Sequence, residues 1–178
     1  MKRTFVLTIL FFGYLSSLSY GESAKNTFKA LKRIEAKCQI GISYRDYGSA
    51  LGDAKYEVNM FLESEEGKAK PALTQAFGKV MNHYQLAGEF WRLKASEGRD
   101  FAIVFMNSPT DTFRSPRNQE LLMRILNLYP DAKKNIKIGG ALEEDAFGTG
   151  LIFIDKLIEF IWKEASKELK QISGMLQK

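Results

Sequence analysis

The stretch LIFIDKLIEFIW, residues 151–162, contains nine large apolar residues in twelve. Only Asp155, Lys156 and Glu159 interrupt it. A membrane-spanning helix of about 20 residues would place these charges near its middle, where burying Asp or Lys costs roughly 2.5–3.5 kcal/mol per residue. The stretch therefore predicts no transmembrane helix and favours a helix that packs against several others.

The apolar residues around this stretch recur at helical spacing and form one wide stripe: Phe147, Leu151, Phe153, Ile154, Leu157, Ile158, Ile161, Trp162, Ala165 and Ile172. Glu143, Glu144 and Asp145 cluster near the start of this predicted helix, where negative charge offsets the helix dipole. The opposite face carries Asp155, Glu159, Lys163, Ser166 and Lys170. Because acids and bases alternate there, it is typical of a solvated face rather than of the Lys/Arg-rich face of a membrane-surface helix.

Three earlier segments share this spacing, and their stripes predict antiparallel packing at shallow crossing angles. The first segment runs from about Ser23 to Gln39 and stops at Gly41. The second opens with a capping box, Ser43 and Asp46, and ends near Ser64. The third begins at Pro71, which suits a first helical turn. The stripes are Phe28, Leu31, Ile34 and Cys38; Tyr47, Leu51, Ala54, Val58 and Phe61; and Leu73, Phe77, Val80, Tyr84, Ala87 and Trp91.

The helical pattern breaks between residues 97 and 114. FAIVFM, residues 101–106, fits a short strand, a buried extended loop or the frayed end of the third helix. Ser115 and Pro116 then open a shorter predicted helix that Pro130 ends; it carries Leu121, Leu122, Ile125 and Leu128. The chain therefore predicts an all-α fold: an antiparallel bundle of about four to five helices, with coiled-coil-like packing and one irregular stretch around 97–114.

The first 21 residues have the layout of a secretory signal peptide. Lys2 and Arg3 precede an apolar run from Phe5 to Leu15, and Ser19 and Gly21 place small residues before a cleavage point at Glu22. We expect Sec-type export, a periplasmic or secreted location, and a single helical-bundle domain over 22–178. Losing Lys2 and Arg3 lowers the formal charge from +5 to +3, which is too weak and too mixed to favour nucleic acid as a partner.

Residues that could support catalysis or hold a cofactor are few. The single histidine, His83, lies beside the third stripe, where a partly buried, hydrogen-bonded side chain is expected. Asp53 and Glu57 share a helix face, as motif-free acid pairs often do. The single cysteine, Cys38, fits a small buried core residue, with an intermolecular disulfide as the alternative. The sequence predicts no catalytic, metal-binding or cofactor-binding residue and leaves enzymatic activity uncertain, leaning toward none.

Glycines inside the predicted helices are the less ordinary feature. Gly48 and Gly52 lie one turn apart in the second helix, and Gly78 and Gly88 interrupt the third. Each costs about 1 kcal/mol relative to alanine in a helix interior, so something should offset the cost. The favoured explanation is close approach of neighbouring helices under aromatic side chains. The alternative is a groove that admits a ligand or partner.

A basic stretch spans residues 114–137, with six cations against Glu120 and Asp131. It fits either a solvated face or a surface that meets an anionic envelope. Together with His83 and three of the glycines, these cations form the candidate partner or ligand surface: Arg114, Arg117, Arg124, Lys133, Lys134, Lys137, Gly48, Gly52, Gly78 and His83.

Three phrases resemble small exported bacterial helical proteins of uncharacterised function: IGISYRDYGSALGDAKYEVNMF, ALTQAFGKVMNHYQLAGEFW and IWKEASKELKQ. The resemblance implies a helical fold and transfers no functional residue. We therefore predict an exported, non-catalytic binding or interaction module of the cell envelope, whose partner is a protein or a small ligand. The alternative is a peripheral membrane-associated protein that uses the amphipathic C-terminal helix and the basic stretch.

Overall fold

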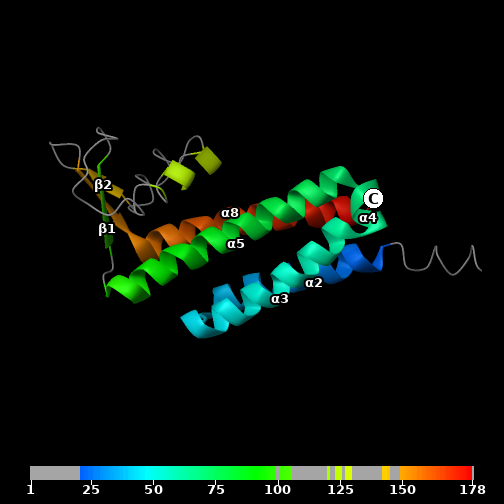
Figure 1. The fold of residues 1–178 in the computed structure, drawn as a ribbon, viewed down its shortest axis with the longest axis horizontal. Helices are drawn as coiled ribbons and strands as arrows, with labels where there is room; N and C mark the ends of the chain where they lie inside the picture. The colour runs from blue at the N-terminus through cyan, green and yellow to red at the C-terminus, as the bar shows by residue number, and fades with distance from the viewer. Residues whose placement is uncertain are drawn as a thin grey trace, which may run out of the picture. The chain divides into compact units, whose positions relative to one another are not determined.

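The computed structural model describes residues 21–98, 101–105, 142–144 and 149–177, together with residues 120, 123–125 and 127–129. Its elements are α2 (Glu22–Ile40), α3 (Tyr44–Glu63), α4 (Glu65–Ala69), α5 (Pro71–Glu97), β1 (Phe101–Phe105), β2 (Leu142–Glu144), β3 (Thr149–Phe153) and α8 (Ile154–Leu176). Figure 1 shows them in chain order. The predicted helical bundle is confirmed, and a small sheet accompanies it.

The described chain forms two compact units. The first contains residues up to 82 and from 165 onward, and the second contains residues 83–164. The boundaries fall inside α5 and α8, so each of these helices contributes to both units. A single domain over 22–178 therefore stays a prediction.

In the first unit, α2 and α3 pack side by side as a helical hairpin (Figure 1). Gly41 ends α2 with a φ of 88°, a conformation that glycine adopts without steric cost. The Ser43 hydroxyl then accepts a hydrogen bond from the Asp46 amide at 3.1 Å, which confirms Ser43 as the N-cap of the predicted capping box. The Asp46 carboxylate accepts from the Ser43 hydroxyl at 2.6 Å. The core holds most of the predicted stripes, with Phe61 and Phe77 in edge-to-face contact at 5.1 Å between ring centroids.

The short helix α4 is an element that the sequence pattern missed. Ser64 ends α3, and its hydroxyl accepts from the Gly67 amide at 3.0 Å, so the same residue also caps the start of α4. Gly67 is buried, and a Cβ there would overlap the carbonyl oxygen of Phe61. Glycine at this position is therefore required by the tight packing of α4 against the end of α3.

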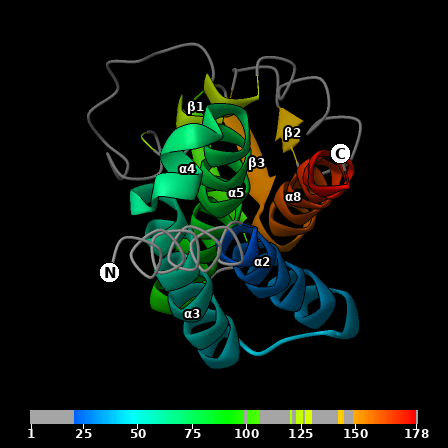
Figure 2. The same ribbon diagram turned by 90° about the vertical axis from the view of Figure 1, so that its right-hand side faces the viewer.

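In the second unit, three antiparallel strands lie in the order β1-β3-β2 (Figure 2). Phe101 pairs with Phe153 and Ile103 with Leu151, while Leu142 pairs with Ile152. FAIVFM is thus a strand over 101–105. In the same unit, Lys94 of α5 pairs with Asp155 of α8 at 2.5 Å, and the Trp91 and Trp162 rings lie 5.7 Å apart, which makes these helix segments antiparallel.

The predicted start of the last helix is wrong. Residues 149–153 form β3, and Glu143 and Glu144 lie in β2, so they do not precede a helix. Short apolar runs fit a strand and a helix equally well in sequence, and pairing with β1 and β2 decides this one. From Ile154 onward the helix is as predicted, with Ile154, Ile158 and Ile161 buried.

Candidate functional site

A groove between α2 and α3 is the candidate site. It encloses about 330 Å³. Its lining comes from three α2 residues (Ala30, Arg33, Lys37) and five α3 residues (Ala50, Gly52, Asp53, Tyr56, Glu57). All of these lie in the first unit.

Small side chains open the groove. Ala30 and Ala50 are both buried, and Gly52 has no atom within 4 Å of the place where a Cβ would stand. Larger residues at the two alanine positions would fill the space between the helices. The groove therefore follows from two buried alanines, one on α2 and one on α3, with the exposed Gly52 at its margin.

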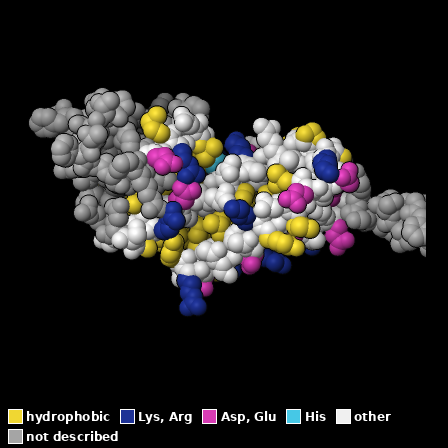
Figure 3. Space-filling model, in the orientation of Figure 1, with side chains coloured by type: hydrophobic (Ala, Val, Ile, Leu, Met, Phe, Trp, Pro, Cys, Tyr) yellow, Lys and Arg dark blue, Asp and Glu magenta, His cyan; other side chains and the backbone are white. Residues whose placement is uncertain are grey.

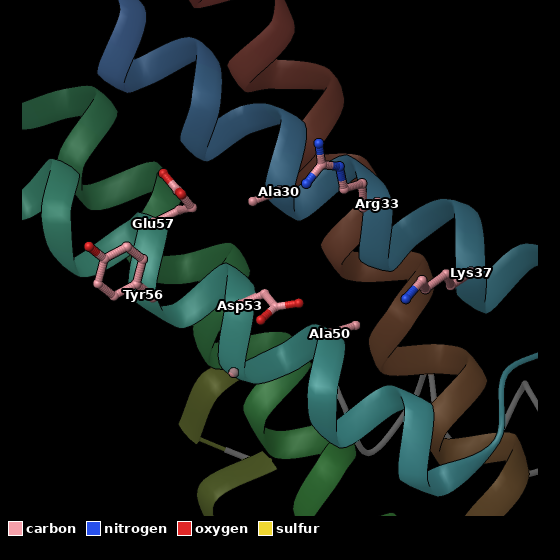
Figure 4. Close-up of a pocket in the computed structure, with 8 residues that line it drawn as sticks. Ala30, Arg33, Lys37, Ala50, Asp53, Tyr56 and Glu57 are labelled. Carbon is pink, nitrogen blue, oxygen red and sulfur yellow. The ribbon is translucent and has the colours of Figure 1, made fainter.

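Opposite charges line the two walls. Arg33 and Lys37 lie one turn apart on α2, and Asp53 and Glu57 lie one turn apart on α3. Figure 4 shows Lys37 and Asp53 pointing toward one another from the two helices. Within the part of the chain that the structure describes, no ion pair uses any of these four side chains.

Tyr56 adds an aromatic edge to the groove. Its side chain is 63% exposed. An exposed tyrosine offers an apolar ring and a hydroxyl to an incoming group. The backbone carbonyl of Glu57 accepts a hydrogen bond from the Thr27 hydroxyl of α2 at 3.0 Å, so this bond joins the two helices that form the groove. The groove thus combines two cations, two carboxylates and one aromatic ring.

The favoured explanation of the helical glycines is wrong, and the alternative has support at one position. Close helix approach at Gly48, Gly52 and Gly78 is wrong, since among the described residues no atom outside the local helix backbone lies within 4 Å of a Cβ at any of them. The same open space excludes contact with an aromatic ring of the described residues. Gly52 lines the groove, in line with the alternative of a groove.

His83 belongs to the second unit, where it packs inside the core. Its side chain is 1% exposed, its Nδ1 lies 2.5 Å from the Tyr129 hydroxyl, and the two rings stack at 5.3 Å. Tyr129 in turn contacts Phe160 edge to face. The expected hydrogen bond is confirmed, while the side chain is fully rather than partly buried. His83 is not part of the groove.

Of the six predicted basic candidates, Arg124 alone is described, and it pairs with Glu89 of α5. Arg114, Arg117, Lys133, Lys134 and Lys137 lie outside the described residues. On the face seen in Figure 3, Lys and Arg side chains alternate with Asp and Glu among the atoms that are coloured. Because most of these cations lie outside the described residues, the role of the basic stretch as an anionic-surface contact stays a prediction.

Cys38 is half-buried rather than fully buried. Burial, and secondly the Glu35 carboxylate, raise the pKa of the Cys38 thiol to about 12. The thiol is therefore protonated at neutral pH and a poor nucleophile. Among the residues that the structure describes, no three His, Cys, Asp or Glu side chains come together as a metal site would require.

Sequence reasoning missed Arg33, Lys37 and Tyr56 and explained Asp53 and Glu57 as an ordinary acid pair. One signal was available in the sequence: two cations spaced i,i+4 on one predicted helix and two carboxylates spaced i,i+4 on the next. That signal becomes informative only once the helices are known to face each other.

Comparison with family models, curated proteins and solved structures finds no match to this chain. The fold and the groove define a helical-bundle protein with a charged site between two helices. In the described part of the chain, no helix combines the length and the apolarity that a membrane span needs.

Proposed function

We propose that this protein is an exported, non-catalytic binding protein of the cell envelope, and that the groove between α2 and α3 holds a small zwitterionic ligand of amino-acid or dipeptide size. The observation that carries the proposal is the pairing of unbridged charges across the groove: Arg33 and Lys37 on one wall, Asp53 and Glu57 on the other.

The charges define the ligand's chemistry. A guanidinium and an ammonium bind a carboxylate, while two carboxylates bind a protonated amine. A ligand with both groups would satisfy both walls at once. The volume of about 330 Å³ lies at the lower end of small-molecule sites, which suits a ligand of this size better than a polymer.

The charge requirement can be tested with matched probes. Thermal unfolding would be followed with free amino acids and dipeptides, with amino-acid amides that lack the carboxylate, and with N-acetyl amino acids that lack the amine. We expect a zwitterion to raise the melting temperature, since a ligand at 100 times its Kd stabilises the fold by about 2.7 kcal/mol. Equal shifts with all three probe classes would contradict the proposal.

Gly52 and Gly48 form a matched pair for locating the site. Both lie in α3 with open space at the Cβ position, but only Gly52 lines the groove. Gly52→Leu should abolish the zwitterion's thermal shift by occupying the groove, whereas Gly48→Leu should leave it intact. Loss of binding in both variants, or in neither, would place the site elsewhere.

Export is part of the proposal, with cleavage after Gly21. The support is the tripartite pattern of the first 21 residues. The mass of the protein recovered from an envelope fraction tests it, since the expected chain begins at Glu22. Recovery of the full-length chain from the cytosol would contradict export.

Peripheral membrane association stays the second prediction, with less support than the groove. The apolar stripe of α8, which a membrane-surface helix would need on its outside, is buried at Leu157, Ile161 and Leu169. Flotation with anionic phosphatidylglycerol vesicles would separate the two: co-flotation of the protein favours the membrane alternative.

A further inference from the structure

Glu66, the second residue of α4, is a buried acid outside the groove. Its residue surface is 4% exposed, and buried carboxylates need partners. One oxygen, Oε1, accepts from the Lys70 ammonium at 2.9 Å. The other, Oε2, faces the backbone amide of Ala24 in the first turn of α2 at 3.4 Å, and the Gly21 backbone amide also donates to this carboxylate.

The first turn of α2 has no side-chain cap of its own. Gly21 occupies the capping position with a φ of 117°, and no neighbouring side chain accepts its amides. Glu66 supplies the missing acceptor from a residue 42 positions away. A negative charge at the N-terminal end of α2 also interacts favourably with the helix dipole. Although burial alone would raise the pKa of Glu66, the hydrogen bonds from Lys70, Gly21 and Ala24 hold it below its usual value.

This carboxylate lies where the proposed cleavage would create a new chain end. Cutting after Gly21 removes one of the donors to Glu66 and turns the backbone nitrogen of Glu22 into a charged ammonium. That nitrogen is one residue along from Gly21, a step of about 3.8 Å. A cavity of about 540 Å³, lined by Gly21, Lys25, Glu66 and Lys70 among others, leaves room for the larger, hydrated group.

We propose that Glu66 is the binding site for the α-ammonium group that processing exposes on Glu22, so that removal of the leader adds an ion pair between α2 and α4. The inference rests on the proposed cleavage after Gly21. In the processed chain, Lys70 stays on Oε1 and the new ammonium takes Oε2. Processing thereby replaces an uncharged amide donor to the carboxylate with a donor that carries a full positive charge, which adds an ion pair.

The pKa of the α-amine of Glu22 is the direct readout. Lys25 and Lys70 also line this cavity and would lower that pKa, whereas the carboxylate of Glu22 itself would raise it. The comparison with a Glu66→Gln variant therefore assigns the contribution of Glu66. In the processed protein we expect the pKa to lie at least about one unit above the ordinary 7.7–8.0 of an α-amino group. It is measured from the pH dependence of the carbon-13 shift of the reductively methylated amine, which keeps its charge.

Two variants give the test its contrast. Glu66→Gln removes the buried charge and should return the α-amine pKa to its ordinary range. Glu65→Gln removes the neighbouring acid, which is exposed and paired with Lys68, and should leave the pKa raised. An ordinary pKa in the unsubstituted protein, or a raised one in Glu66→Gln, would overturn the proposal.

A second comparison covers the case in which Glu66→Gln does not fold. A chain that retains residues 16–21 before Glu22 keeps the Gly21 amide as a neutral donor to Glu66 and places its amine six residues before Glu22. Its α-amine pKa should lie in the ordinary range. Equal pKa values in the two chains would overturn the proposal. An exported protein that begins at a residue other than Glu22 would also overturn it, whereas zwitterion binding in the groove would be unaffected by that result.

Discussion

At the scale of single residues, the glycines separate into two groups that their sequence does not distinguish. Gly48 and Gly78 lie inside helices with nothing near their Cβ positions, whereas Gly67 touches the backbone of Phe61. The sequence predicted close approach at Gly48 and Gly78, which is wrong, and it did not single out Gly67, where close approach occurs. It could not make this distinction, because close approach depends on which backbone lies opposite.

The first prediction concerns these glycines. Gly48→Ala and Gly78→Ala should each stabilise the protein by about 0.5–1 kcal/mol, since alanine is the better helix former and the space is open. Gly67→Ala should destabilise it, because the new Cβ would overlap the Phe61 carbonyl. Chemical denaturation measures all three. A destabilised Gly48→Ala variant would show that α3 packs differently from the structure.

The second prediction concerns Cys38. With a pKa of about 12, the thiol at pH 8 is ionised to about one part in ten thousand, so it should react far more slowly with iodoacetamide than an unfolded control. Glu35→Gln removes the weaker of the two causes and should lower the pKa without restoring the ordinary value. A thiol that reacts at the rate of the unfolded chain would contradict this.

At the scale of elements, apolar spacing predicted α2, α3 and α5 well, because each buries one continuous stripe. It failed where an element depends on contacts that apolar spacing does not encode. β3 exists because β1 and β2 pair with it, and α4 exists because Ser64 caps it and Gly67 fits under α3. The groove was missed for the same reason, since its walls come from two helices and its charges matter only when they face each other.

The third prediction tests the junction between α3 and α4. The Ser64 hydroxyl donates to the Phe61 carbonyl at 2.6 Å and accepts from the Gly67 amide at 3.0 Å. Ser64→Ala removes both bonds and should cost about 1–2 kcal/mol of unfolding free energy. Ser43→Ala removes an exposed cap at the start of α3 and serves as the control, with a smaller expected loss. Each serine hydroxyl makes two hydrogen bonds, and those of Ser64 are the more buried. Equal losses would show that this burial adds nothing to the Ser64 cap.

At the scale of the whole molecule, the predicted bundle is confirmed and the sheet is new. Long-range polar contacts were beyond the sequence, and Glu66 is the clearest case. It joins α4 to the start of α2 across 42 residues. Nothing in the phrase Ser64-Glu65-Glu66 marks the second acid as buried and the first as exposed.

The fourth prediction is acid sensitivity through Glu66. Its pKa is lower in the folded protein than its ordinary value near 4.5. The carboxylate's contribution to stability is therefore fully present above that ordinary value and is lost as pH falls through the lowered, folded-state value. Between pH 6 and pH 3, the unsubstituted protein should lose more stability than Glu66→Gln. Parallel pH profiles for the two proteins would contradict the assignment.

The direct join between β3 and α8 has a consequence for how the gene can vary. Phe153 is the last residue of the strand and Ile154 is the first residue of the helix, so no connecting loop lies between them. One inserted residue would rotate the helix by about 100° relative to the strand. Because of this rotation, Ile154, Leu157 and Ile158 would no longer face the interior. Insertions and deletions should therefore be rare at the junction of β3 and α8 among homologous sequences. They should be more frequent in the turn at residues 41–43.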